Sequence, residues 1–194
     1  MVDIWKKLTS EKASEIIDDE EFEAEALELL ETDARPEAFI ETLSAAGKWT
    51  DAVMFMARAL PKREAVWWAC VCAGGTDMLK KHKDEVLALK TAEKWTFKPT
   101  EENRVGAFLQ SQKSNTPSIG TMSCLAAAFS SGKLSLSEGQ SFEPDTTAFP
   151  KIISGIILIS ANDKGPEQFD TLLEQFLQQG INIACGGSGK LKTA

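Results

Sequence analysis

Few side chains in this sequence have the types and spacing that catalysis requires. His82 is the single histidine, so a nucleophile activated by an imidazole base would have to use it. It lies in the run Lys80-Lys81-His82-Lys83, where we expect it to be exposed and without a catalytic role. The 29 acidic residues allow many carboxylate pairs, but no spacing singles one out. We therefore predict that the protein is not an enzyme.

The alternative hypothesis is a small enzyme or effector with a carboxylate-based site near the loop 131–148. Helical periodicity is lost across this segment, and loops of this length in compact domains are often functional. A deep pocket lined by two acidic side chains with raised pKa values would favour this hypothesis. A pocket lined by aromatic and aliphatic groups would favour binding.

The cysteines and the glycine-rich C-terminus offer little further chemistry. The four cysteines, which include Cys70 and Cys72, show no paired C-x-x-C spacing, and we expect them to be buried thiols. His82 alone does not complete a ligand set around the Cys-x-Cys, so we predict no metal and no cofactor. The stretch 186–190, GGSGK, lacks the first glycine and the final Ser or Thr of a phosphate loop. We expect residues 186–194 to form a flexible tail.

The charge is concentrated at the N-terminus. The 194-residue chain has a formal charge of −8, which argues against sequence-independent nucleic-acid binding. Residues 1–46 hold 14 acids and 4 bases, whereas the other 148 residues hold 15 acids and 17 bases. The run Asp18-Asp19-Glu20-Glu21 is predicted to steer a basic protein partner, or to dock on the chain's own segment 80–83. The simpler interpretation is a solvated helix face.

Helical spacing dominates the rest of the sequence. It predicts an all-α fold: one orthogonal or antiparallel bundle of about seven to nine helices over residues 36–185, preceded by an acidic helical arm over 1–35. The apolar stretch 152–161 is β-branched, but it has no partner strand, so we predict a buried helix. Its ten residues are too few to span a membrane, and the N-terminus does not resemble a secretory signal. We therefore expect a cytoplasmic protein.

The adjacent residues Trp67 and Trp68 are the best candidates for a binding site. On a helix they point about 100° apart, so one can face the core while the other faces a groove. Arg63 and Glu64 lie one turn earlier and could form the rim of that groove. We predict that Trp68 binds a partner, with Arg63 and Glu64, because tryptophan and arginine are frequent anchors of interfaces. The alternative is that both indoles are buried in the core.

The block around these tryptophans, residues 60–73, reads LPKREAVWWACVCA and resembles the signature of an uncharacterised bacterial family of helical proteins. The resemblance continues more weakly in residues 92–95, 99–104 and 176–180. It implies a small cytoplasmic protein, and some members are encoded beside components of type VI secretion systems. No catalytic residue is implied by the resemblance.

These observations favour a non-catalytic interaction protein, either an adaptor, an accessory factor or a chaperone-like protein, and the resemblance connects it with a type VI secretion system. The expected partner is a secretion-system component or a basic protein. A further hypothesis is a homodimer that shares the amphipathic face of Phe169, Leu173 and Phe176 across a two-fold axis.

Overall fold

The protein is all-α, as predicted. The computed structural model describes residues 5–18, 20–114, 116–136, 139–145 and 147–190. Within these ranges it contains ten α-helices, three short 3-10 helices and one pair of two-residue strands. The α-helices are α1 (Ala24–Leu27), α2 (Pro36–Ala45), α3 (Trp49–Ala59), α4 (Lys62–Gly74), α5 (Asp77–Lys80), α6 (Lys83–Phe97), α7 (Glu101–Ser111), α8 (Ile119–Ala128), α9 (Ala148–Ala161) and α10 (Phe169–Ala184). The other elements are η1 (Ala13–Glu15), β1 (Leu134–Ser135), β2 (Ser141–Phe142), η3 (Asn162–Lys164) and η4 (Pro166–Gln168).

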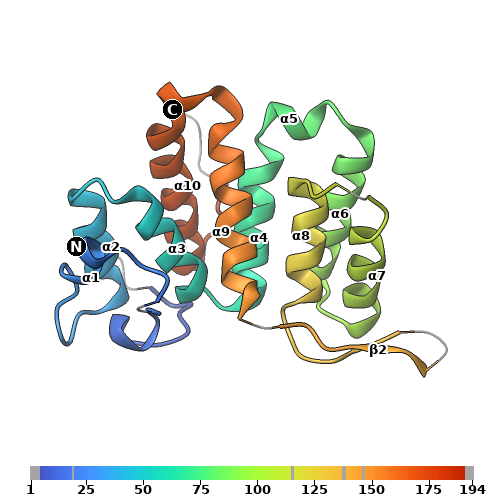
Figure 1. Ribbon diagram of the computed structural model, residues 1–194, viewed down its shortest axis with the longest axis horizontal. Helices are drawn as coiled ribbons and strands as arrows, with labels where there is room; N and C mark the ends of the chain where they lie inside the picture. The colour runs from blue at the N-terminus through green and yellow to red at the C-terminus, as the bar shows by residue number, and fades with distance from the viewer. Residues whose placement is uncertain (1–4, 19, 115, 137–138, 146, 191–194) are drawn as a thin grey trace.

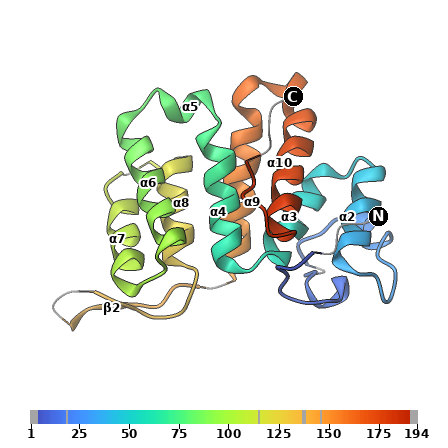
Figure 2. The same ribbon diagram turned by 180° about the vertical axis from the view of Figure 1, so that it is seen from behind.

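Helix α4 is the centre of the bundle. It contacts α6 and α8 on one side and α9 and α10 on the other. Figures 1 and 2 show it between the group α6, α7, α8 and the group α3, α9, α10. This position explains its composition, since a helix that has neighbours on several sides needs apolar residues around most of its circumference.

The indole of Trp68 packs directly against the backbone of α10. Trp68 is fully buried, and its Nε1–H donates a hydrogen bond of 2.7 Å to the carbonyl of Phe176. A Cβ at Gly180, one turn further along α10, would lie 2.9 Å from Cε2 of Trp68. Gly180 therefore does not end the helix, as its type suggests, but makes room for the indole inside it.

Two segments whose apolar spacing indicates one continuous helix, residues 22–30 and 77–95, differ in the structure. The amphipathic pattern around residues 22–30 forms the single turn α1, although Phe22 and Ala26 are buried as expected. The segment 77–95 is divided into α5 and α6. The break follows Lys80, and His82, the N-cap of α6, has an extended backbone conformation that is incompatible with a continuous helix. The start of α5 has a distant cap, because the carboxylate of Asp163 accepts the backbone N–H groups of Asp77 and Met78, at 2.7 and 2.8 Å.

Residues 5–18 and 20–35 pack against the bundle and do not form a separate helical arm. Trp5, Ala13 and Ile16 belong to the same buried cluster as the bundle core. The backbone N–H groups of Lys6 and Lys7 both donate to the carbonyl of Ala184, at 2.8 and 3.0 Å, near the C-terminus of α10. Thr9 donates in the same way to Ala59, at the end of α3. The segment thus satisfies helix carbonyls that lack partners within their own helices.

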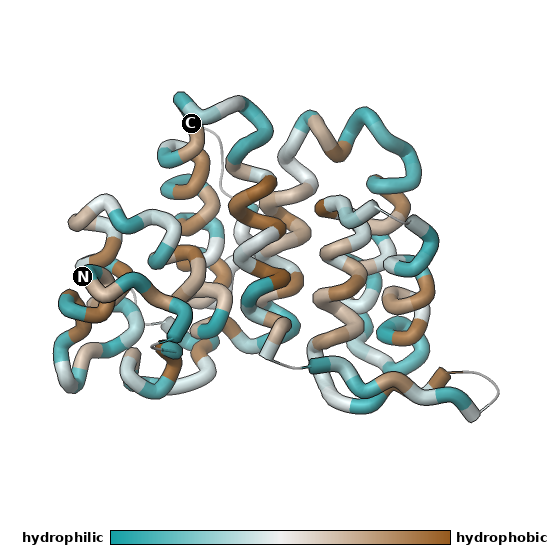
Figure 3. The backbone as a smooth tube through the Cα atoms, viewed as in Figure 1, coloured by the Kyte–Doolittle hydropathy of each residue, from teal (hydrophilic) through white to brown (hydrophobic). Residues whose placement is uncertain are grey.

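Helix α9 confirms the prediction of a buried helix over the late apolar stretch. Ile153, Ile156 and Ile157 are fully buried, and the brown colour along α9 in Figure 3 shows its apolar character. Ile159, on the other hand, is 43% exposed. Within the described ranges, no helix combines the length and the apolar character that a membrane span requires.

We expect Gly180→Ala to destabilise the protein by about 1–3 kcal/mol, because the added methyl group overpacks a fully buried indole. The matched control is Gly106→Ala in α7, where an added Cβ meets nothing within 4 Å. That change should stabilise the helix by about 0.5–1 kcal/mol. Urea unfolding of both variants tests this. Equal or greater stability of Gly180→Ala would contradict the proposed contact.

Candidate functional site

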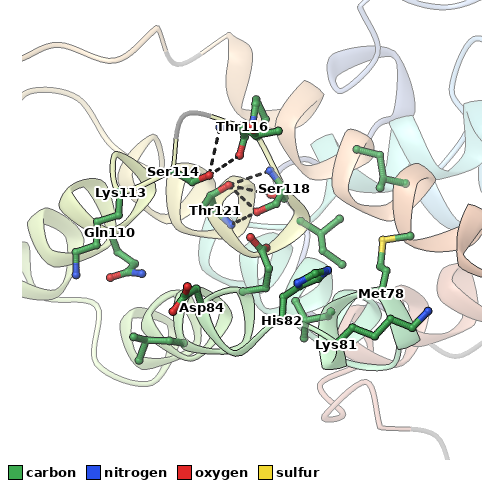
Figure 4. A pocket seen from close by; sticks show the side chains of 16 residues that line it. Met78, Lys81, His82, Asp84, Gln110, Lys113, Ser114, Thr116, Ser118 and Thr121 are labelled. Atoms are coloured by element: carbon green, nitrogen blue, oxygen red, sulfur yellow. Dashed lines mark hydrogen bonds between the residues drawn. The ribbon is translucent and has the colours of Figure 1, made fainter.

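A groove opens where the ends of several helices meet. It has a volume of about 1010 Å3 and is formed by α5, the first turns of α6, the end of α7, the start of α8 and one residue of α9 (Figure 4). We call it the α5–α8 groove. Its lining comprises Met78, Leu79, Lys81, His82, Asp84, Glu85, Leu87, Gln110, Lys113, Ser114, Thr116, Pro117, Ser118, Ile119, Thr121 and Ile159.

The α5–α8 groove presents large apolar side chains to solvent. Leu87 is 53% exposed and Ile159 is 43% exposed, although both lie on long helices of the core. Met78, Pro117 and Ile119 add to the apolar lining. A cluster of exposed apolar groups that polar residues surround is typical of a surface that binds another molecule.

Polar groups in the groove are largely occupied by the fold itself. The carboxylate of Glu85 accepts the N–H of Gly120 at 3.1 Å, in the first turn of α8. Ser118 and Thr121 form a capping box, in which each side chain accepts a backbone N–H of the other. Because a carboxylate already occupies the N-terminus of α8, this end of the helix is a poor site for an anion. The remaining charges at the rim are those of Lys81, Lys113 and Asp84.

The predicted binding residue Trp68 lies elsewhere, and its predicted role is corrected. Its side chain is fully buried and its N–H is bonded to Phe176, so it cannot reach a partner in this fold. Arg63 is exposed on α4, and Glu64 pairs with Lys7 at 3.3 Å. The structure therefore does not assemble these three residues into one site, and none of them lines the α5–α8 groove. The partly exposed indole of the pair is Trp67.

Two residues of the acidic run, Asp18 and Glu21, pair with cations of the bundle. Glu21 pairs with Arg58 of α3 and, at 3.1 Å, with Lys151 of α9. Asp18 lies 3.7 Å from the same arginine. Glu20 is exposed, whereas Asp19 lies outside the described residues. The alternative prediction, docking on segment 80–83, is wrong for Asp18 and Glu21, because these two carboxylates contact cations of α3 and α9 instead.

The loop 131–148 is organised by a buried arginine. The guanidinium of Arg104 in α7 donates to the carbonyls of Ala128, Ser131, Gly132 and Lys133, at distances of 2.7–3.1 Å, and pairs with Glu101 at 2.8 Å. The side chain of Arg104 is 6% exposed. Beyond it, β1 and β2 form a short antiparallel hairpin, and Phe142 of β2 stacks on Phe108 with centroids 5.1 Å apart.

Two carboxyl groups at this loop have lowered pKa values, whereas a carboxyl group that acts as a general acid needs a raised pKa. A hydrogen bond from Arg104 lowers the pKa of Glu101, and hydrogen bonds from Thr147 lower the pKa of Asp145. Both groups are therefore stabilised as carboxylates. Neither provides the raised pKa that would favour the hypothesis of a carboxylate enzyme.

Three of the four cysteines are buried, as expected, whereas Cys185 is only partly buried. Burial raises the pKa of Cys70 and Cys72 well above the usual value, and it raises the pKa of Cys124 to about 12. Such thiols are poor nucleophiles and poor metal ligands. Among the residues that the structure describes, no group of three or more His, Cys, Asp or Glu side chains is placed to hold a metal.

The amphipathic face proposed for a dimer is part of the core. Leu173 is fully buried and Phe176 is 8% exposed, since both pack inside the bundle. The prediction that these two residues are shared across a two-fold axis is therefore wrong for the folded chain. A homodimer through another surface stays a prediction.

Sequence reasoning missed the α5–α8 groove because its residues come from several elements. One signal was present: helical spacing over 77–95 placed Leu79, Val86 and Leu89 on the inward face and left Leu87 off it. No such signal marks Ile159, which lies in an apolar run whose other residues are mostly buried.

Comparison with known proteins places the chain in a family. The model of a family of unknown function, DUF6931, matches residues 39–184. The chain belongs to this family. The matched region includes Trp68, Arg104, Gly180 and all of the α5–α8 groove. Neither a curated protein nor a solved structure matches the sequence. Membership in DUF6931 confirms the resemblance to an uncharacterised family, and it assigns no activity.

We expect Glu21→Gln to destabilise the protein by about 1–2 kcal/mol, because it removes the charge that both Arg58 and Lys151 contact. The neighbouring Glu20→Gln is the matched control and should change stability by less than about 0.5 kcal/mol, because Glu20 is exposed. Urea unfolding measures both, and the difference should shrink as salt is added. Equal effects of the two substitutions would show that Glu21 does not hold the N-terminal segment.

We expect Arg104→Met to lower the free energy of unfolding by about 3 kcal/mol, because it leaves buried carbonyls and Glu101 without their hydrogen-bond donor. The free energy of unfolding of Arg104→Lys, measured in urea, should also be at least about 1 kcal/mol lower than that of the wild type. The reason is that an ammonium group cannot reproduce the planar set of donors of a guanidinium. The control is Arg63→Met on the exposed side of α4. Hydrogen exchange should also show faster exchange at Leu136, whose N–H donates to Gln140. An Arg104→Lys variant as stable as the wild type would show that the fork of donors is not required.

Proposed function

We propose that this protein is a non-catalytic interaction protein, an adaptor or accessory factor, that binds a segment of a protein partner in the α5–α8 groove. The observation that carries the proposal is the exposure of Leu87 and Ile159 at one hollow surface. Burying these side chains against a partner would be favourable by about 25 cal/mol for each Å2 of apolar surface removed from water.

The chemistry of the groove supports binding more than turnover. The hydroxyls of Ser118 and Thr121 are committed to helix capping, and the carboxylate of Glu85 is bonded to Gly120. His82 lies at the exposed rim, at the N-terminus of α6. Because these groups are already bonded or lie at the rim, apolar contact is the main interaction that the groove offers.

The family resemblance supports a more specific proposal. Some members of the family that the block 60–73 resembles are encoded beside type VI secretion genes, so we propose a component of that bacterial system as the partner. The same resemblance supports a cytoplasmic location. The acidic run is not needed for this proposal, because Asp18 and Glu21 pair with cations of the bundle.

The test compares two leucines of equal exposure. Leu87, 53% exposed, lies in the groove, and Leu109, 54% exposed, lies on α7 outside its lining. Wild type, Leu87→Glu and Leu109→Glu are used to capture proteins from cells of the native host, and each captured protein is quantified by mass spectrometry. We expect at least one protein to be reduced about tenfold or more by Leu87→Glu and not by Leu109→Glu.

Thermal unfolding serves as the control, since both variants should melt near the wild type. Capture that is the same for all three proteins would overturn the groove as a binding surface. A groove-dependent partner that is not a secretion-system component would overturn the more specific proposal and leave the adaptor role in place.

A further inference from the structure

The glycine-rich end of the chain is folded back on the bundle. We call residues 186–190, which follow the C-cap Cys185 of α10, the C-terminal strap. The side-chain oxygen Oδ1 of Asn182 accepts the N–H of Gly189 at 2.8 Å, and the backbone carbonyl of Asn182 accepts the N–H of Gly187 at 2.8 Å. A Cβ at Gly187 would lie 2.2 Å from Asn182, and Gly189 has a φ of +74°. The glycines therefore allow this tight return, and the expected flexible tail is instead held in place over its described residues.

The strap places a lysine over an aromatic pair. The indole N–H of Trp67 donates to the carbonyl of Ser188 at 2.8 Å. The Nζ of Lys190 lies 5.7 Å from the centre of the Trp67 ring, within the range of a cation–π interaction. Phe97 packs edge-on against Trp67 with centroids 5.2 Å apart, and it is 72% exposed. Two aromatic side chains and an ammonium group thus meet at one surface.

An acidic residue that interacts electrostatically with Lys190 lies on the same helix as Phe97. Glu93 is one turn before Phe97 on α6, so the two residues lie on the same face of the helix. Burial raises the pKa of Glu93, and the positive charges of Lys190 and Lys90 act in the opposite direction. Aromatic faces bind organic ammonium groups in proteins, and a nearby carboxylate adds the attraction of an opposite charge.

We propose that Trp67, Phe97 and Glu93 form a binding site for an organic ammonium group, and that Lys190 of the C-terminal strap is its internal occupant. An external ammonium group replaces the Lys190 side chain on the ring while the strap backbone stays bonded to Trp67. This site goes beyond the proposed function: it is on a different surface and shares no residue with the α5–α8 groove.

The test follows the indole N–H resonance of Trp67 by NMR, assigned with the variant Trp67→Phe. The probes are choline, its neutral isostere 3,3-dimethylbutan-1-ol, and N-acetyl-lysine methylamide. We expect choline to shift the Trp67 resonance saturably, with an apparent Kd of about millimolar, as suits a single exposed cation–π contact. If Lys190 covers the ring about three quarters of the time, Lys190→Ala lowers this Kd about fourfold.

Matched variants keep the result interpretable. Glu93→Gln should weaken choline binding, whereas Glu102→Gln, which removes an exposed acid of α7, should not. Binding of the lysine derivative in addition to choline identifies the natural ligand as a lysine side chain of a partner, and binding of choline alone identifies it as a small quaternary ammonium. Equal shifts with the neutral alcohol, or no saturable shift in the folded Lys190→Ala variant, would overturn the site. Neither outcome bears on the groove, which Leu87→Glu tests separately.

Discussion

The close contact between Trp68 and Gly180 is the constraint on which the arrangement of the bundle depends. The indole occupies the space that a side chain at position 180 would need, and its N–H is bonded to Phe176 within the same helix. This fixes α10 against α4 in both distance and register. Since α10 also contacts α3 and α9, and α4 also contacts α6 and α8, both halves of the bundle are positioned relative to this one contact.

Outside the core, polar side chains connect the segments that apolar packing leaves undefined. Arg104 gathers carbonyls from the end of α8 and the following loop, and Asp163 caps α5 from the connection between α9 and α10. Glu21 attaches the N-terminal segment to α3 and α9. In each case a charged group meets several partners at once, which makes the geometry of the connection specific. The acidity of the N-terminal region is thus partly structural.

The candidate surfaces lie where these connections leave apolar groups uncovered. Leu87 and Ile159 belong to helices whose other apolar residues are mostly buried, and they are exposed because α5 and the α7–α8 connection pass beside them without covering them. Phe97, the last residue of α6, packs against Trp67 of α4 beside the C-terminal strap and remains largely exposed. The α5–α8 groove is suited to an apolar segment, and the surface around Trp67 is suited to a cation.

The sequence by itself determined the all-α class and most of the long helices, because apolar spacing and caps such as Thr100 are local properties. It also indicated a buried helix over 152–161, since no second strand was present to satisfy the backbone of a strand. Only the tertiary structure decided which of Trp67 and Trp68 is buried, which side chain caps the start of α5, and that Gly180 lies inside a helix. These depend on Phe176, Asp163 and the approach of α10 to α4, which are distant in sequence. Local periodicity specifies whether a residue faces inward or outward, but not which residue, distant in sequence, it contacts. A site such as the α5–α8 groove is formed only by such long-range contacts.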